Sequence, residues 1–276
     1  MRTLIHLSDL HFGRIQGTLI RPLIDSVAQL NPDVIAVSGD LTQRARNKQF
    51  KAARYFLDAL PAIKIVVPGN HDVPLFNVAA RLQKLKRYRR YITDDLEPFY
   101  SDHELAVLGM NTARSLAFKS GRINHRQVAR INERLSGLAD TVAKVVVTHH
   151  PFDLPAAYPK AALVGRAAMA INGLRDCRVD LFLAGHFHVS TATPTTFRYG
   201  VNGYSSVIVQ AGTAISTRTK GETNAFNVIR IDLPYISVER REWNPERAIF
   251  VGSARDHFQR VRSGWQQVLS REGQRP

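Results

Sequence analysis

The stretch from Ile63 to Asp72 constrains the fold of this chain more than any other part of it. Its first half, residues 63–67, is a β-branched run typical of a buried strand, and Pro68-Gly69 ends it. An amide, an imidazole and a carboxylate follow at once, as Asn70, His71 and Asp72. Such groups are costly to bury without partners, so their position at the carboxyl end of a strand indicates a functional site.

The same pattern, an apolar strand followed directly by side chains able to bind metal, recurs along the chain. In order, these groups are Asp9 and His11; Asp40; Asn70 and His71; His149 and His150; and His186 and His188. Carboxylate, amide and imidazole donors suit borderline ions such as Mn, Fe or Zn. The only cysteine, Cys177, lies outside these loops, and because structural zinc sites usually use cysteine, a catalytic site is favoured. The donors are too many for one ion, which favours two ions that share a carboxylate.

Between these groups the chain alternates strands and helices, which predicts a largely parallel sheet with crossover helices. The expected strands are residues 3–7, 34–37, 63–67, 105–110, 142–148 and 179–184, and the expected helices are 18–30, 48–60 and 125–135. Further strands over 195–199, 206–210, 225–231 and 236–243 have no long helix between them. We expect these strands to pair antiparallel. The change from helix crossovers to strands connected without long helices predicts a second sheet.

We expect one domain over residues 1–276, with a basic, lid-like insertion at about 74–100 and a C-terminal helix and tail at about 255–276. The helix is predicted over about 255–270. A single cysteine excludes an intrachain disulfide and favours a reducing compartment, so a cytoplasmic location is expected. Neither a signal peptide nor an apolar run of about 18 residues is visible.

The charge of the chain favours anionic partners. Lys and Arg number 38 against 23 Asp and Glu, which gives a formal net charge of +15. Nucleic acid, acidic lipid and phosphorylated small molecules all fit this surplus, and a solvated basic surface is the alternative. Residues 81–91 interleave basic side chains with leucine and tyrosine. They fit a lid that attracts anionic substrate, a helix lying on an anionic membrane, or only a solvated face.

The motifs Asp-x-His, Gly-Asp, Gly-Asn-His-Asp, His-His-Pro and Gly-His-x-His, in this order between Asp9 and His188, resemble those of the calcineurin-like metallophosphoesterase superfamily. Within it, the chain is most similar to bacterial class III cyclic-nucleotide and glycerophosphodiester phosphodiesterases. The resemblance implies an α/β fold, a four-layer α/β/β/α sandwich with two mixed β-sheets. It also implies a phosphoesterase that depends on two metal ions and hydrolyses phosphodiesters with a hydroxide from a water that both ions share.

The resemblance assigns seven residues to the metals. It implies that Asp9, His11 and His188 hold the first ion, that Asn70, His149 and His186 hold the second, and that Asp40 bridges the two.

The resemblance also implies the catalytic groups. His71 matches a histidine that contacts the substrate phosphate and protonates the leaving group, for which a pKa in the neutral range is suited. Asp72 matches an acid that orients this histidine. Neighbouring residues seldom aim at one point, so His149 is taken as the ligand, and His150 lines the cleft or packs beside it. Arg44 and Arg46, just after Asp40, favour a more anionic or bulkier substrate.

Three alternatives remain open. The same site serves pyrophosphatases acting on lipid-linked UDP-sugars, which the basic segment and the expected C-terminal helix would bring to the inner membrane surface. It also serves nucleases, which the charge supports, although no stacked aromatic platform is visible and nucleic acid is not favoured. A catalytically inactive binding scaffold is the least favoured, because every ligand position is filled. The substrate, the metals and the oligomeric state are not specified by the sequence.

Overall fold

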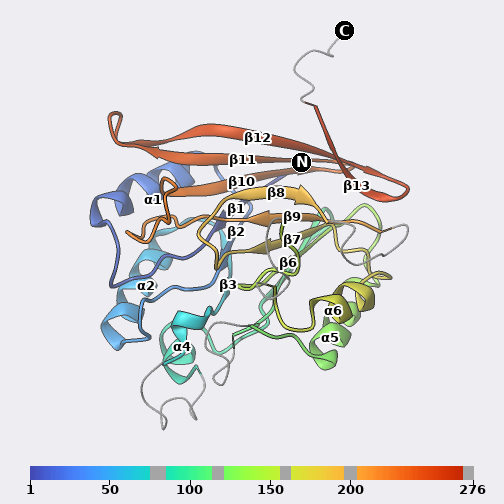
Figure 1. Ribbon diagram of the computed structural model, residues 1–276, viewed down its shortest axis with the longest axis horizontal. Coiled ribbons are helices and arrows are strands. Elements are labelled where there is room, and N and C mark those ends of the chain that lie inside the picture. Colours follow the sequence, from blue (N-terminus) through green and yellow to red (C-terminus); the bar gives the residue numbers. More distant parts are fainter. Residues whose placement is uncertain (75–84, 114–120, 156–162, 196–203, 270–276) are drawn as a thin grey trace.

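The structure is a computed structural model that describes residues 1–74, 85–113, 121–155, 163–195 and 204–269. In these residues two mixed β-sheets pack face to face, and helices cover the outer face of each (Figure 1). The predicted four-layer α/β/β/α sandwich is therefore confirmed. No helix in these ranges is long and apolar enough to span a membrane.

The first sheet has 7 strands in the order β13-β12-β11-β10-β1-β2-β3. Strands β1, β2 and β3 are parallel, and the strands beyond β1 add in antiparallel fashion. The strands are β1 Arg2–Leu7, β2 Val34–Ser38, β3 Ile63–Val67, β10 Ala225–Asp232, β11 Tyr235–Asn244, β12 Ile249–Val261 and β13 Gly264–Val268. Its helical cover comes from the 3₁₀ turn η1 Gly17–Leu19 and the helices α1 Ile20–Gln29, α2 Asn47–Ala59 and α4 Lys86–Tyr91.

The second sheet has 6 strands in the order β4-β5-β6-β7-β9-β8. The strands are β4 Phe99–Ser101, β5 Leu105–Gly109, β6 Ala143–Val147, β7 Leu181–Ala184, β8 Thr191–Pro194 and β9 Val207–Gln210, and the covering helices are α5 His125–Leu135 and α6 Ala167–Gly173. We expected residues 206–210 to pair antiparallel throughout, but β9 is parallel to β7. The chain first forms β8 on the far side of β9, so it returns to β7 in the parallel direction.

The apolar side chains fill three layers. Successive residues of a strand point to opposite faces, so Leu4 packs between the sheets while Ile5 packs against the helices. The same holds for Val145 and Val146 in the second sheet. Because both faces are buried, the central strands are continuous apolar runs, which is why they are visible in the sequence.

The predicted C-terminal helix over residues 255–270 is wrong. These residues belong to the antiparallel hairpin of β12 and β13, which extends the first sheet. Phe258 and Trp265 are seven positions apart and would share one helix face, yet in the hairpin both are buried between the sheets. Gly264, with φ +113°, follows the tight turn. Residues 255–261 are extended because β12 pairs with β11, a contact between strands that outweighs the local preference for a helix.

Two further predictions fall partly outside the described residues. Of the strand expected over 195–199, only Thr195 is described, and it lies just after β8. Of the basic insertion at 74–100, residues 75–84 are not described. In the part that is, Tyr88 of α4 is fully buried and donates a hydrogen bond to the Val66 carbonyl at 2.9 Å. The apolar side of α4 thus packs on the protein core, and the lid function stays a prediction.

Candidate metal centre

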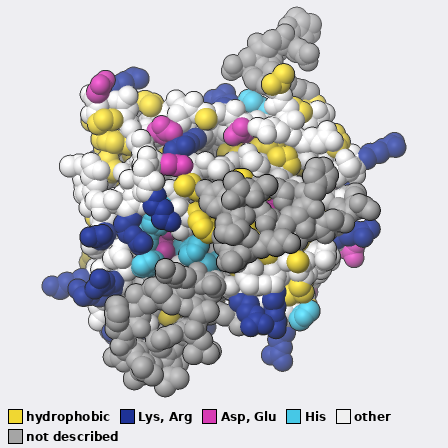
Figure 2. Space-filling view, in the orientation of Figure 1, with side chains coloured by type: hydrophobic (Ala, Val, Ile, Leu, Met, Phe, Trp, Pro, Cys, Tyr) yellow, Lys and Arg dark blue, Asp and Glu magenta, His cyan; other side chains and the backbone are white. Residues whose placement is uncertain are grey.

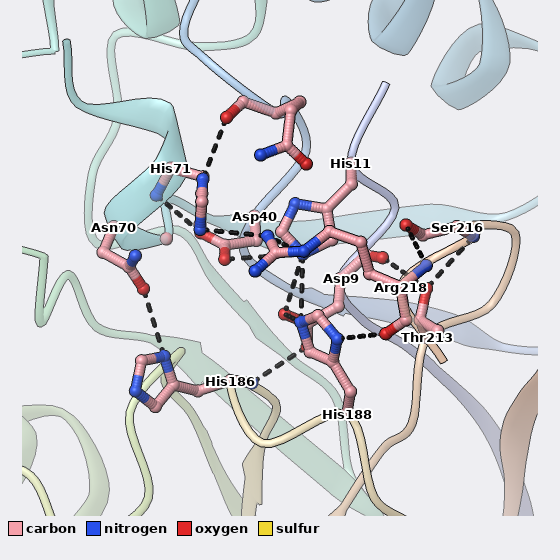
Figure 3. A network of polar contacts seen from close by, with 12 residues as sticks. Asp9, His11, Asp40, Asn70, His71, His186, His188, Thr213, Ser216 and Arg218 are labelled. Carbon is pink, nitrogen blue, oxygen red and sulfur yellow. Dashed lines mark hydrogen bonds and ion pairs between the residues drawn. The ribbon is translucent and has the colours of Figure 1, made fainter. Parts of the chain in front are cut away.

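The predicted site residues lie in loops at the carboxyl ends of parallel strands of both sheets. Asp9 and His11 follow β1, Asp40 follows β2, the 3₁₀ turn η2 Asn70–Asp72 follows β3, His149 follows β6, and His186 and His188 follow β7. The structure brings the side chains of all these loops together. Figure 3 shows those that follow β1, β2, β3 and β7. On the surface, histidine side chains gather in a hollow that Lys and Arg side chains flank (Figure 2).

The first donor set is Asp9, His11 and His188. Nε2 of His188 lies 3.1 Å from Asp9 Oδ1 and 3.1 Å from His11 Nε2. All three side chains are buried, and Asp9 Oδ1 has no aligned hydrogen-bond donor in the described part of the chain. Burial acts to raise the pKa of Asp9, but the His11 and His188 rings outweigh it and hold that pKa well below its usual value. One carboxylate oxygen and two imidazole nitrogens so placed can hold a cation.

The second donor set is Asn70, His149 and His186. The amide oxygen of Asn70 lies 3.0 Å from His149 Nε2 and 3.1 Å from His186 Nδ1, and the two ring nitrogens are 3.3 Å apart. His186 thus offers Nδ1, whereas the other histidines offer Nε2. These donors also fit a cation, and the two sets together contain six of the seven residues that the resemblance assigned to the ions, all except Asp40.

Asp40 lies between the two sets. Its Oδ2 is 3.7 Å from His11 Nε2 and 3.5 Å from His149 Nε2, while Oδ1 accepts a hydrogen bond from the His71 backbone at 2.8 Å. Burial, followed by the negative charge of Asp9, raises the pKa of Asp40 well above its usual value. A buried carboxylate such as Asp40, beside a second one, is stabilised in its ionised form by nearby cations, so the residues present fit a pair of metal ions.

Backbone carbonyls fix the histidine tautomers. His149 donates its Nδ1 proton to the Ser38 carbonyl at 2.8 Å, and His188 donates its Nδ1 proton to the Arg218 carbonyl at 2.5 Å. The Nε2 lone pairs of both rings are thereby directed at the donor sets. Burial lowers the pKa of His11 to about 4 and that of His186 to about 3. The His11 and His186 rings are therefore neutral near pH 7, as metal binding requires.

His71 is held beside the donor sets by two contacts. Its Nδ1 donates to the Gln43 carbonyl at 2.9 Å, so Nε2 accepts a hydrogen bond from Arg218 Nη1 at 3.1 Å. Burial lowers the pKa of His71 to about 4. The expectation of a neutral-range pKa is therefore wrong for this state, because desolvation disfavours the imidazolium.

Asp72 is buried and joins two loops. Its carboxylate accepts hydrogen bonds from the backbone of Leu41, Thr42 and Gly69 at 2.9–3.1 Å, and another from the Thr42 hydroxyl at 2.9 Å. The expectation placed this carboxylate against the ring of His71, which instead takes its orientation from Gln43. Asp72 thus holds the loop after β2 against the loop after β3, and its catalytic role stays a prediction.

His150 lies beside His149 and His186, close enough for the three side chains to form a candidate ion site. Its ring centroid is 4.8 Å from that of His149, and its Nδ1 is 2.9 Å from the Thr112 hydroxyl. The nitrogen that faces Asn70 and Asp40 belongs to His149. This geometry favours His149 as the ligand and agrees with packing of His150 beside the cleft.

Sequence reasoning missed the loop between β9 and β10. In this loop Thr213 donates to the Asp9 carbonyl at 2.6 Å, and Arg218 Nη1 lies 3.5 Å from His11 Nε2. The loop follows an apolar strand, as the motif loops do, which was the available signal. It contains no histidine and no residue of the five motifs, so this position after a strand was too weak a signal to mark it as part of the site.

The fold and the site define a class, the hydrolases in which two metal ions sit at the carboxyl ends of strands from two packed sheets. The chain belongs to the family of calcineurin-like phosphoesterases, whose profile matches residues 2–190. These enzymes are metal-dependent hydrolases of phosphoric esters that use two ions, which confirms the expectations for the enzyme class and the cofactors.

Two relatives carry names of phosphodiesterases. The chain is 30% identical over 206 residues to the glycerophosphodiester phosphodiesterase GpdQ of Enterobacter lignolyticus, covering 69% of this chain and 72% of the relative. It is 23% identical over 206 residues to a probable cyclic nucleotide phosphodiesterase of Synechococcus, covering 67% and 73%. The suspected similarity is thus confirmed.

Solved structures show the same fold. A dimetal phosphatase from Danio rerio superposes with a TM-score of 0.65 at 15% identity, over 91% of this chain and 98% of that chain. The purple acid phosphatase PPD1 from yellow lupin seeds superposes with a TM-score of 0.67 at 10% identity, over 92% and 53%. At this identity the likeness concerns the fold alone.

Proposed function

We propose that this protein is a two-metal phosphodiesterase that hydrolyses a small anionic phosphoric diester. The observation that carries the proposal is the position of Asp40 Oδ2, 3.7 Å from a nitrogen of one donor set and 3.5 Å from a nitrogen of the other. One carboxylate placed between two donor sets is the arrangement that a bridged pair of ions needs. The names of the two relatives support a diester as the substrate class.

In this proposal Asp9, His11 and His188 hold one ion, Asn70, His149 and His186 hold the other, and Asp40 contacts both. The oxygen and nitrogen donors fit Mn, Fe or Zn. When bound, such a pair supplies Lewis-acid activation of the attacking water and offsets charge on the phosphoryl group.

His71 is proposed to contact the substrate phosphate through Nε2, the ring atom that faces Arg218. An anionic phosphate beside the ring favours its protonated form, which opposes the effect of burial. Asp72 supports the position of His71, because its hydrogen bonds join the loop that carries Asp40 to the loop that carries His71.

The net charge of +15 supports an anionic small-molecule substrate. Lys220 is exposed, and its Nζ lies 5.8 Å from the centre of the Phe187 ring, beside the ligand loop after β7. The reading as a pyrophosphatase at a membrane loses its main support, because the expected C-terminal helix is a β-hairpin and Tyr88 of α4 is buried in the protein.

A substrate panel on Mn-loaded protein tests the proposal. It compares bis-p-nitrophenyl phosphate, p-nitrophenyl phosphate, cyclic nucleotides, glycerophosphodiesters and UDP-sugars. We expect kcat/KM to be higher for the diester than for the monoester, and Asp40→Asn to abolish turnover while Asp25→Asn, an exposed carboxylate on α1, leaves it unchanged. A diester-to-monoester ratio below one overturns the substrate class. Absence of metal-dependent turnover of every substrate in the panel overturns the proposal that the protein is a hydrolase.

A further inference from the structure

The loop between β9 and β10 places one arginine against the candidate metal centre. Arg218 Nη1 lies 3.1 Å from His71 Nε2 and 3.5 Å from His11 Nε2 (Figure 3). We infer that Arg218 binds the phosphoryl group of the substrate and is a specificity-determining residue of this site. The inference rests on the proposed function and deepens it.

The guanidinium has weak partners where it lies. In the part of the chain that the structure describes, its hydrogen bonds go to the nitrogens of two imidazoles, and no carboxylate forms an ion pair with it. Arginine has five N–H donors and cannot lose its charge, so most of these donors remain available to a ligand. The side chain is half-buried, and a planar guanidinium at reduced exposure recognises phosphate oxygens well.

The backbone of Arg218 is fixed to the site by its own hydrogen bonds. The Arg218 carbonyl accepts the Nδ1 proton of His188 at 2.5 Å, and its amide donates to the Ser216 hydroxyl at 3.1 Å. The Asn224 side chain donates to the Ser216 carbonyl at 2.8 Å, and Thr213 ties the loop to the Asp9 carbonyl at 2.6 Å. The loop that carries the guanidinium is thus held in place by its own hydrogen bonds and is tied to the loops that carry Asp9 and His188.

The present partner of Arg218 is one that a phosphate can replace. A neutral imidazole nitrogen is a weaker acceptor for a guanidinium than an anionic phosphate oxygen, because the bond to phosphate is assisted by charge on both groups. A phosphoryl oxygen therefore takes the place of His71 Nε2 as the acceptor for Arg218. This exchange releases Nε2 of His71 toward the substrate and leaves the carbonyl that holds His188 undisturbed.

Arg218→Met and Arg218→Lys test the inference, with Arg21→Met as a control that removes one positive charge from exposed α1. The measurements are binding of inorganic phosphate to Mn-loaded protein by calorimetry, Mn content, and kcat/KM for bis-p-nitrophenyl phosphate. For Arg218→Met we expect phosphate affinity to fall about 10-fold and kcat/KM about 100-fold, with partial recovery in Arg218→Lys. Mn content should be unchanged, since the substitutions retain the carbonyl that holds His188.

Two outcomes would overturn the inference. In the first, the Arg218→Met variant binds phosphate as tightly as the wild-type protein and the Arg21→Met control. In the second, the Arg218→Met variant loses Mn in parallel with its activity. The second would make Arg218 a support of the metal donors. Failure of the proposed function looks different, because the wild-type protein would then bind phosphate without turning over any diester.

Discussion

At the scale of single residues, the donor atoms depend on unusual backbone conformations. Asp9, His11, Asp40, His186 and His188 all have a positive φ, between 49° and 77°. For residues other than glycine this conformation costs about 1–2 kcal/mol each, and it persists only where the surrounding structure enforces it. Its concentration in the predicted metal ligands is independent support for a functional site.

Glycines make room for these donors. A Cβ on Gly185 would lie 1.8 Å from Ser8 Oγ and 2.4 Å from Asp9 Oδ2, and one on Gly69 would lie 2.1 Å from Asp40 Oδ1. The motif glycines are therefore packing requirements of the site: the loops approach so closely that no side chain fits between them.

Gly185→Ala should displace Ser8 and Asp9. We expect a loss of about 1–3 kcal/mol in the free energy of unfolding and weaker binding of Mn, because the added methyl group pushes a ligand oxygen away. Denaturant unfolding and elemental analysis measure these effects. Gly137→Ala is the matched control, since its Cβ would meet nothing within 4 Å. Normal Mn content in Gly185→Ala would show that the loops can separate without harm.

His71→Ala should lower kcat for the diester by about 100- to 10,000-fold while both ions stay bound, because His71 contributes a proton-transfer or phosphate-binding group rather than a ligand. Steady-state kinetics and Mn content are the measurements. Loss of Mn from this variant would place His71 among the ligands and contradict the assignment.

At the scale of elements, the parallel strands could be predicted from the sequence and the C-terminal hairpin could not. Buried parallel strands are continuous apolar runs, and each ends at a polar loop. By contrast, β11 and β12 carry many charged residues because one of their faces is only partly covered. On that face Glu239 of β11 is almost fully buried among Arg230, Arg241 and Arg255, which come from three adjacent strands. These ion pairs become visible only when the strands pair.

Glu239 should make stability depend on pH. Burial would raise its pKa, but hydrogen bonds from the three arginines outweigh burial and lower the pKa from 4.5 to about 2. The folded protein therefore gains stability from the ionised carboxylate above pH 4.5 and loses this gain as the pH falls toward 2. We expect Glu239→Gln to lower the free energy of unfolding by about 1–3 kcal/mol at pH 7 and by less at pH 3.

Urea unfolding at the two pH values measures this difference. Glu246→Gln, at an exposed position in the turn after β11, is the control and should match wild type at both. An equal loss at pH 7 and pH 3 would mean that Glu239 stabilises the strands by packing alone.

At the scale of the whole molecule, the candidate metal centre is built from loops of both sheets. Asp9, Asp40 and Asn70 come from loops of the first sheet, whereas His149 and His186 come from loops of the second. Ions held by these residues would link the two halves of the sandwich at one edge, in addition to the apolar layer between the sheets.

Removal of metal should destabilise the folded protein. Ligands that bind only the folded state add about 2.7 kcal/mol at a concentration 100 times Kd, so chelation should lower Tm by several degrees and Mn should restore it. Thermal unfolding with EDTA and with added Mn measures this. In Asp40→Asn the restoring effect of Mn should be much smaller. A Tm that does not respond to Mn in wild type would contradict a centre shared by both sheets.

The sequence by itself determined the order of strands and loops in the first two-thirds of the fold and which polar strand ends meet at one site, because buried strands and polar strand ends leave a local pattern. Only the tertiary structure decided which nitrogen each histidine offers, that Asp72 joins two loops, that β12 and β13 form a hairpin, and that Arg218 reaches the site. These features depend on contacts between residues far apart in the chain, such as Arg218 and His71, and no local pattern records such contacts.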